Sequence, residues 1–260
     1  MKIFNTPILL FVLSLSLLVS TNSTAQSSTS PPNNFNGWYY YVAQIDISPK
    51  WGIHFDGQIR VHNIIERFSQ STARAALLYR FTPSTYLAAG YAIIPTQIYP
   101  EGYLVPEQRI YQEFKIKSKK LVKDIQLCHR IRSEQRFFGL KKQLDEGEEF
   151  VHDKWLFKDR FRYKLGAGAP IKKFNPDLGN KLCAGGSAEI FLSGYNLNNK
   201  GSLLDQYRTE VFMDYAFNKV VSLNLAYINE LKFNGNDIKM INHNFKLTLK
   251  TKLQFYKKSK

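Results

Sequence analysis

Hydrophobic and polar residues alternate along most of the chain after residue 36. In residues 243–256 (HNFKLTLKTKLQFY) phenylalanine and leucine occupy one set of alternate positions, while lysine, threonine and glutamine occupy the other. Residues 125–138 (IQLCHRIRSEQRFF) follow the same rule, with arginine and glutamate on the polar side. A strand turns successive side chains to opposite faces, so this period of two predicts β-strands.

The same reading extends to the rest of the chain. It predicts strands at 37–47, 51–62, 71–82, 85–95, 107–117, 124–138, 153–166, 182–194, 206–217, 220–232 and 242–256. Many of these runs reach ten residues, which is longer than is usual in soluble sheets and suits a tilted crossing of a bilayer.

The predicted connections alternate in length. Short ones are expected at 48–50, 82–84, 118–123 and 218–219, and longer ones at 63–70, 95–106, 138–152, 195–205 and 232–241. Short turns on one side and long loops on the other are typical of outer-membrane barrels. Residues 166–181 (GAGAPIKKFNPDLGNK) interrupt the pattern, as an irregular connection where a short turn is expected.

These features predict an all-β fold: one closed, antiparallel, up-and-down transmembrane barrel with a polar, charged lumen. The pattern contains eleven runs, but bacterial barrels have even strand numbers, so twelve strands are expected, with ten as the second choice. Backbone groups in lipid have no water to bond, which requires the sheet to close.

The ends of the chain differ from this body. Residues 1–25 carry one lysine, an apolar run and small residues before Gln26, which predicts a signal peptide. Residues 26–36 (QSSTSPPNNFN) are expected to form a flexible polar leader, residues 37–256 the barrel, and residues 257–260 a basic tail. The two cysteines, Cys128 and Cys183, are too few for a disulfide framework.

Alternation alone does not say which face meets water. Tyrosine and tryptophan cluster at strand ends, for example at Trp38 to Tyr41, Trp51 and Trp155, as in the aromatic girdles of membrane barrels. With apolar faces toward lipid, the charged faces would line the lumen and pair across neighbouring strands. The expected charge ladder consists of Arg60, Arg109, Glu113, Arg130, Arg132, Glu134, Arg136, Arg160, Arg162, Glu189, Arg208 and Glu210.

Several motifs on these strands occur together in one known family. They are EQRIYQ (107–112), RIRSEQRF (130–137), RFRY (160–163), AEIF (188–191) and DQYR (205–208) followed by DYAF (214–217). With them, residues 37–256 resemble the bacterial outer-membrane β-barrel proteins grouped as domain of unknown function 2490. The resemblance implies an outer-membrane barrel of a Gram-negative bacterium, with outer-membrane lipid and the barrel-assembly machinery as partners. It implies no reaction or ligand.

Three functions fit these features. The first is a structural barrel without catalysis, in which the Arg/Glu ladder fills the lumen. The second is a porin-like, narrow, anion-preferring pore or a binding barrel for small anionic solutes, favoured by the surplus of lysines at 246, 250 and 252.

The third is an outer-membrane lipid-modifying enzyme. The five histidines, His54, His62, His129, His152 and His243, show no triad or metal spacing, so we expect no catalytic residue, metal or cofactor. An isoelectric point of about 9.6 would suit a nucleic-acid-binding protein. The predicted export from the cytoplasm and the placement of the charges at alternate strand positions argue against that function.

Overall fold

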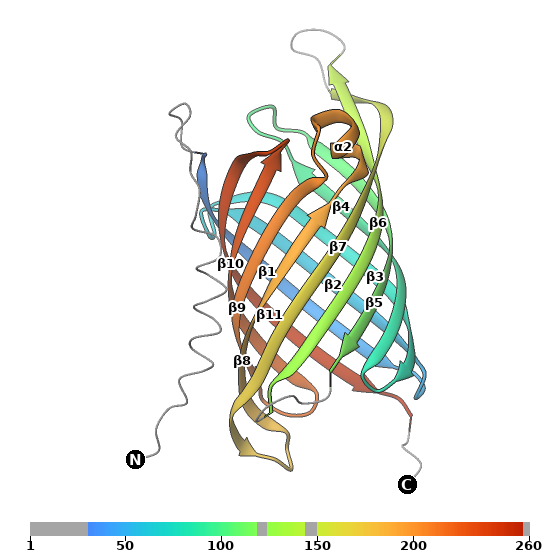
Figure 1. Ribbon diagram of the computed structural model, residues 1–260, viewed down its shortest axis with the longest axis vertical. Helices are drawn as coiled ribbons and strands as arrows, with labels where there is room; N and C mark the ends of the chain where they lie inside the picture. Colours follow the sequence, from blue (N-terminus) through green and yellow to red (C-terminus); the bar gives the residue numbers. More distant parts are fainter. Residues whose placement is uncertain (1–30, 119–123, 144–149, 257–260) are drawn as a thin grey trace. The chain divides into compact units, whose positions relative to one another are not determined.

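The computed structural model describes residues 31–118, 124–143 and 150–256. The predicted signal peptide and basic tail lie outside these ranges. The chain divides into the units Met1–Pro31 and Pro32–Lys260, and the second unit holds a closed β-barrel (Figure 1). Its strands are β1 (Asn33–Asp46), β2 (Trp51–His62), β3 (Arg67–Thr82), β4 (Thr85–Gln97), β5 (Leu104–Lys117), β6 (Gln126–Gln143), β7 (Phe150–Asn175), β8 (Asn180–Leu192), β9 (Leu204–Ala216), β10 (Val221–Asn234) and β11 (Asp237–Gln254).

The barrel confirms the all-β, closed fold and corrects the strand number. In the described part of the chain it has eleven strands, where twelve were expected. Each strand pairs with its neighbours in sequence, and β1 pairs with β11 to close the wall. Since the number is odd, β1 and β11 run parallel, so the sheet is mixed and not wholly antiparallel. The preference for an even number was therefore wrong, whereas the eleven alternating runs each correspond to a strand.

The barrel is polar inside and apolar outside. On β2, Asp56 and Gln58 are buried while the alternate residues Phe55 and Ile59 are exposed. Strand β11 repeats this arrangement, with polar side chains such as Asn244 inside and apolar ones outside. A sheet in a water-soluble sandwich has the reverse distribution, with its apolar face buried.

Several connections differ from their predictions. Residues 166–181 are mostly strand: β7 continues to Asn175, and a four-residue turn leads into β8. The β6–β7 and β7–β8 ends extend past their neighbours at opposite ends of the barrel (Figure 1). The expected long loop at 232–241 is a tight hairpin, because Asn234 pairs with Asp237 around Gly235, whose φ is 64°.

The connection from β8 to β9 contains a short helix that the pattern did not predict, α2 (Gly194–Lys200). Ser193 caps its start by accepting a hydrogen bond from the Asn196 N–H, and Gly201 ends it with φ 69°. The carboxylate of Asp159 on β7 accepts further bonds from the backbone N–H groups of Gly194 and Tyr195, both at 2.9 Å. These contacts fix α2 against the barrel wall.

The predicted leader 26–36 also needs correction, because β1 begins at Asn33. Asn34 and Asn36 donate side-chain hydrogen bonds to Asn242 and Asn244 of β11, at 3.2 and 3.0 Å. These amide pairs lie along the parallel seam that closes the barrel. The polar composition of this segment thus serves pairing with a distant strand.

A small apolar cluster occupies part of the interior beside β3, β4 and β5. It consists of Ala76, Leu78, Ala88 and Tyr111, with Tyr86 packed against it. Gly90 makes room for the Tyr111 ring, since a Cβ at that position would lie 2.6 Å from the Tyr111 hydroxyl. Charged and polar side chains line much of the rest of the lumen.

Candidate functional site: the charged lumen

The charged lumen is built from the inward positions of neighbouring strands. Alternation places Glu107, Arg109 and Glu113 on one face of β5, and Arg130, Arg132, Glu134 and Arg136 on the facing side of β6. The antiparallel register sets Arg109 opposite Arg136 and Glu113 opposite Arg132. Unlike charges therefore meet either directly across the strands, as Glu113 and Arg132 do, or two residues along on the same face, as Glu107 and Arg136 do.

Glu134 is the centre of the network. Its side chain is fully buried, and its carboxylate is within 4 Å of four guanidinium groups: Arg160 at 2.7 Å, Arg162 at 2.8 Å, Arg109 at 3.3 Å and Arg132 at 3.7 Å. These four arginines come from β5, β6 and β7, so one carboxylate ties three strands together. A carboxylate buried this deeply is stable only when its charge is compensated.

Two further carboxylates extend the network toward β5. Glu107 accepts from Arg109 at 2.6 Å and from Arg136 at 2.7 Å. Glu113 accepts from the Arg132 Nε at 2.8 Å, and Arg130 lies 3.8 Å from it. Each carboxylate thus serves two arginines.

Glu189 carries the network to the other side. It accepts from Arg130 at 2.6 Å and from Arg162 at 2.8 Å, and Arg208 lies 4.0 Å away. Arg208 in turn pairs with Glu230 of β10. The chain of ion pairs is therefore continuous from β5 to β10.

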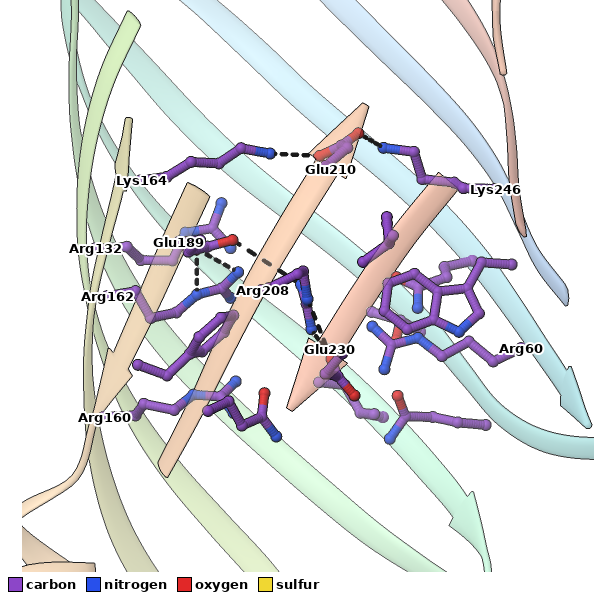
Figure 2. Close-up of a pocket in the computed structure, with 18 of the residues that line it drawn as sticks. Arg60, Arg132, Arg160, Arg162, Lys164, Glu189, Arg208, Glu210, Glu230 and Lys246 are labelled. Carbon is purple, nitrogen blue, oxygen red and sulfur yellow. Dashed lines mark hydrogen bonds and ion pairs between the residues drawn. The ribbon is translucent and has the colours of Figure 1, made fainter. Parts of the chain in front are cut away.

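Glu210 forms a separate bridge. Lys164 donates to it at 2.7 Å and Lys246 pairs with its other oxygen, so the two lysines approach Glu210 from opposite sides (Figure 2). In the same view, Arg208 and Glu230 lie beneath this bridge. The bridge joins β7, β9 and β11.

The structure brings most of the expected ladder together. Among the described residues, eleven of its twelve members form ion pairs, and Arg60 is the exception. The Arg60 guanidinium lies 4.0 Å from the ring centre of Trp38. It can also donate to the amide oxygen of Gln58 at 2.8 Å when that amide is turned to satisfy its neighbours.

Sequence reasoning missed two groups of residues. Glu107 was not included in the ladder, although it continues the alternation of Arg109 and Glu113. The second group is aromatic: Trp38, Tyr111 and Phe191 are buried among the arginines rather than placed at strand ends. Phe191, two residues after Glu189, contacts the Arg160, Arg162 and Arg208 guanidinium groups at 4.4 to 5.2 Å, within cation–π range. Its position on the polar face was the available signal.

The side chains leave two cavities in the lumen. The inner chamber, of about 270 Å³, is lined by Trp38, Phe191 and the guanidinium groups of the ladder. Figure 2 shows several of these arginines around it. The wide chamber, of about 810 Å³, includes Lys173, Lys181 and both cysteines in its lining. The two share Arg130, Lys164, Glu210 and Lys246 among other residues, so the Glu210 bridge lies where they meet.

The side chains of the described lumen are mainly charged groups in ion pairs. Within the described residues, no group of three His, Cys, Asp or Glu side chains could hold a metal ion. Cys128 and Cys183 are free thiols. Across the described ranges, no helix has the length and apolar character needed to span a bilayer. The chemistry that this site does provide is a dense, paired array of guanidinium and carboxylate groups.

The fold and its interior define the class of protein: a closed β-barrel with a lumen of paired charges. A family model described as "Protein of unknown function (DUF2490)" matches residues 35–240. The chain belongs to this family, which confirms the resemblance seen in the sequence motifs. A search of curated proteins gave no match.

Proposed function

We propose that this protein is an outer-membrane β-barrel of a Gram-negative bacterium, exported by an N-terminal signal peptide. The observation that supports it most is the inverted distribution of side chains, with Phe55, Leu225 and Phe245 exposed and Asp56, Glu134 and Glu230 buried. In water the exposed side chains would cost about 25 cal/mol per Å² of apolar surface, whereas in acyl chains they are solvated. Outer-membrane lipid and the barrel-assembly machinery are the partners that this role requires.

The lumen supports a structural role for the ladder. Ion pairs that join every strand from β5 to β10 fix the register of these strands, since a slip of one residue would turn the charges toward lipid. The Glu210 bridge lies across the lumen where the two chambers meet, and the rings of Trp38 and Phe191 line the inner chamber. We therefore infer a barrel that does not conduct ions.

Two measurements test this proposal. Membrane fractionation of the native host should recover the mature protein in the outer membrane, extracted only by detergent. Purified barrel inserted into planar bilayers should give no conductance steps in potassium chloride. The control is Lys246→Gln, which removes one side of the Glu210 bridge but leaves Lys164 at 2.7 Å. Recovery of the mature protein in the soluble fraction would contradict the membrane assignment.

The second candidate is a narrow anion-preferring pore, and the excess of arginine and lysine in the inner chamber favours it. It predicts single-channel steps whose reversal potential in a salt gradient follows chloride. Such steps in the wild-type barrel would contradict the closed barrel and support the pore.

The proposal assigns no catalysis. Lipid A from a deletion strain should therefore have the same acyl and phosphate composition as lipid A from the parent. A changed composition that is restored by the wild-type gene would favour the lipid-modifying enzyme instead.

A further inference from the structure

The inner chamber has a surface of unbalanced charge. Among the residues that line it, twelve are arginine or lysine and three are glutamate. The cations are Arg60, Arg74, Arg109, Arg130, Arg132, Arg136, Arg160, Arg162, Lys164, Arg208, Lys232 and Lys246. A space of about 270 Å³ with this lining is a strongly positive environment.

The geometry of the ladder explains the imbalance. Glu107 and Glu134 are buried behind the guanidinium groups that bind them, and neither carboxylate lines the chamber. Asp56 and Glu113, which bind Arg74 and Arg132, also lie outside its lining. The carboxylates thus hold the arginines in place, and the arginines face the chamber.

The compensation is also incomplete in number. The twelve cations form ion pairs with eight carboxylates, so four positive charges have no counterpart among the described residues. Two features account for part of this deficit: Lys164 and Lys246 share Glu210, and Arg60 forms no ion pair with a described residue. Positive charges that lie close together without a counter-charge repel one another, and a bound anion would offset that cost.

A second observation points to a ligand. The Nε of Arg130 is buried and forms no hydrogen bond in the described structure, because the nearest carboxylate oxygen, from Glu113, lies 3.8 Å away; Arg130 lines both chambers. Buried donors are almost always satisfied by a protein group, water or a ligand. The Arg130 side chain, at the junction of the two chambers, therefore has a donor that its carboxylate partners leave without a hydrogen bond.

We propose that the inner chamber binds one small multivalent oxyanion of the phosphate or pyrophosphate class. Multiple charge matches the excess of four cations, and oxygen acceptors match the guanidinium and ammonium donors. The volume lies just below the usual range for ligand pockets, which limits the ligand to a few heavy atoms. The chamber lies within the barrel wall, so the ligand is a free solute rather than a lipid headgroup. This inference goes beyond the structural role and does not depend on the location of the protein.

The test uses the complete folded barrel in an uncharged detergent. Isothermal titration with sodium pyrophosphate should show saturable binding with one site per barrel, whereas sodium chloride at the same ionic strength should show none. Arg60→Gln removes a cation without leaving any carboxylate unpaired, and it should weaken pyrophosphate binding about tenfold or more. Lys246→Gln should weaken it similarly, while Glu210 keeps Lys164.

The matched control is Arg67→Gln. Arg67 is exposed at the start of β3, where its guanidinium lies 4.4 Å from the Tyr99 ring centre, outside the chamber. The control should bind pyrophosphate as the wild type does, and circular dichroism should show that all variants are folded. Absence of saturable binding by the wild type, or equal affinity in the wild type and both chamber variants, would overturn the proposal. Conductance and fractionation results would be unaffected by that failure.

Discussion

At the scale of single residues, arginine is suited to this lumen because its planar guanidinium can bind two carboxylates at once. Arg162 does so by donating to Glu134 through Nη1 and to Glu189 through Nε, both at 2.8 Å. A lysine offers one compact charge and could not bridge the two acceptors with the same geometry. The aromatic rings of Phe191 and Trp38 pack against the faces of these groups, which carry no hydrogen-bond donors.

Glu134 provides the sharpest test of the ladder. Glu134→Gln keeps the shape of the side chain but leaves four guanidinium groups around a neutral amide. We expect the free energy of unfolding to fall by about 3 to 5 kcal/mol, as for other buried ion pairs that lose one partner. Urea unfolding of the barrel in lipid vesicles measures this change. The control, Glu66→Gln, removes an exposed carboxylate and should change the value by less than about 0.5 kcal/mol.

Gly90 and Gly57 allow a matched comparison within two strands. At Gly90 an added methyl group would lie 2.5 Å from the Ala75 carbonyl oxygen and 2.6 Å from the Tyr111 hydroxyl, whereas at Gly57 it would meet nothing within 4 Å. Gly90→Ala should therefore lower the free energy of unfolding by about 1 to 3 kcal/mol through overpacking. Gly57→Ala should leave it unchanged or raise it slightly. Equal effects of the two substitutions, in the same vesicle assay, would contradict the close packing of Tyr111.

At the scale of elements, α2 is attached to the ladder through polar contacts. Asn196 donates to Asp205 at 2.9 Å, and Asp205 lies 3.6 Å from Arg160, which binds Glu134. On its other side, α2 depends on Asp159, whose carboxylate accepts two backbone N–H bonds. The position of this helix is thus set by β7 and β9 together.

Asp159→Ala should loosen α2 while the barrel stays folded. The substitution removes two hydrogen bonds to a charged acceptor. Each such bond contributes about 1.5 to 3 kcal/mol when buried, and less at a partly exposed site such as this one. Trypsin should then cleave after Lys200, within the same connection, at least several-fold faster than in the wild type. Asp177→Ala, in the β7–β8 turn, should leave the cleavage rate at Lys200 unchanged. A rate at Lys200 that is the same in both variants would show that Asp159 does not hold the helix.

The elements also show what the sequence could predict. Alternation is local, so it located all eleven strands and the polar faces of β5, β6 and β7. The start of β1 could not be found in this way, because Asn34 and Asn36 become strand residues by pairing with Asn242 and Asn244, 208 positions away. The end of β7 was missed because Gly166 and Gly168 suggested a loop, yet these glycines lie opposite Ser187 and Gly185 in a regular ladder.

The composition of the site was predictable, but its partners were not. Period two placed Glu134 and Arg162 in the lumen, while only the register between β6 and β7 decides that Arg160 lies opposite Glu134. Trp38 lies on β1 and Phe191 on β8, in separate parts of the wall. The two rings therefore share one lumen only because the barrel closes. The chamber between them is likewise a property of the closed barrel.

At the scale of the whole barrel, closure and topology determine where the first strand begins and the last strand ends. An odd number of strands with a parallel β1–β11 pair places Asn33 at the same end as the β2–β3 connection and α2. Gln254 lies at the other end, with the short turns. In outer-membrane barrels the short turns face the periplasm, so the outer-membrane location proposed above would place the start of β1 at the cell surface.

Arginine substitutions at two exposed valines distinguish a barrel surrounded by acyl chains from one surrounded by water. Val211 lies in the middle of β9 and Val220 in the turn before β10, and they are almost equally exposed, at 44% and 43%. In water, arginine at either site should be harmless. In a bilayer, Val211→Arg should cost about 2 to 4 kcal/mol of folding free energy and Val220→Arg about 0 to 1. Equilibrium folding into vesicles measures both values, and two equally small costs would mean that acyl chains do not surround this wall.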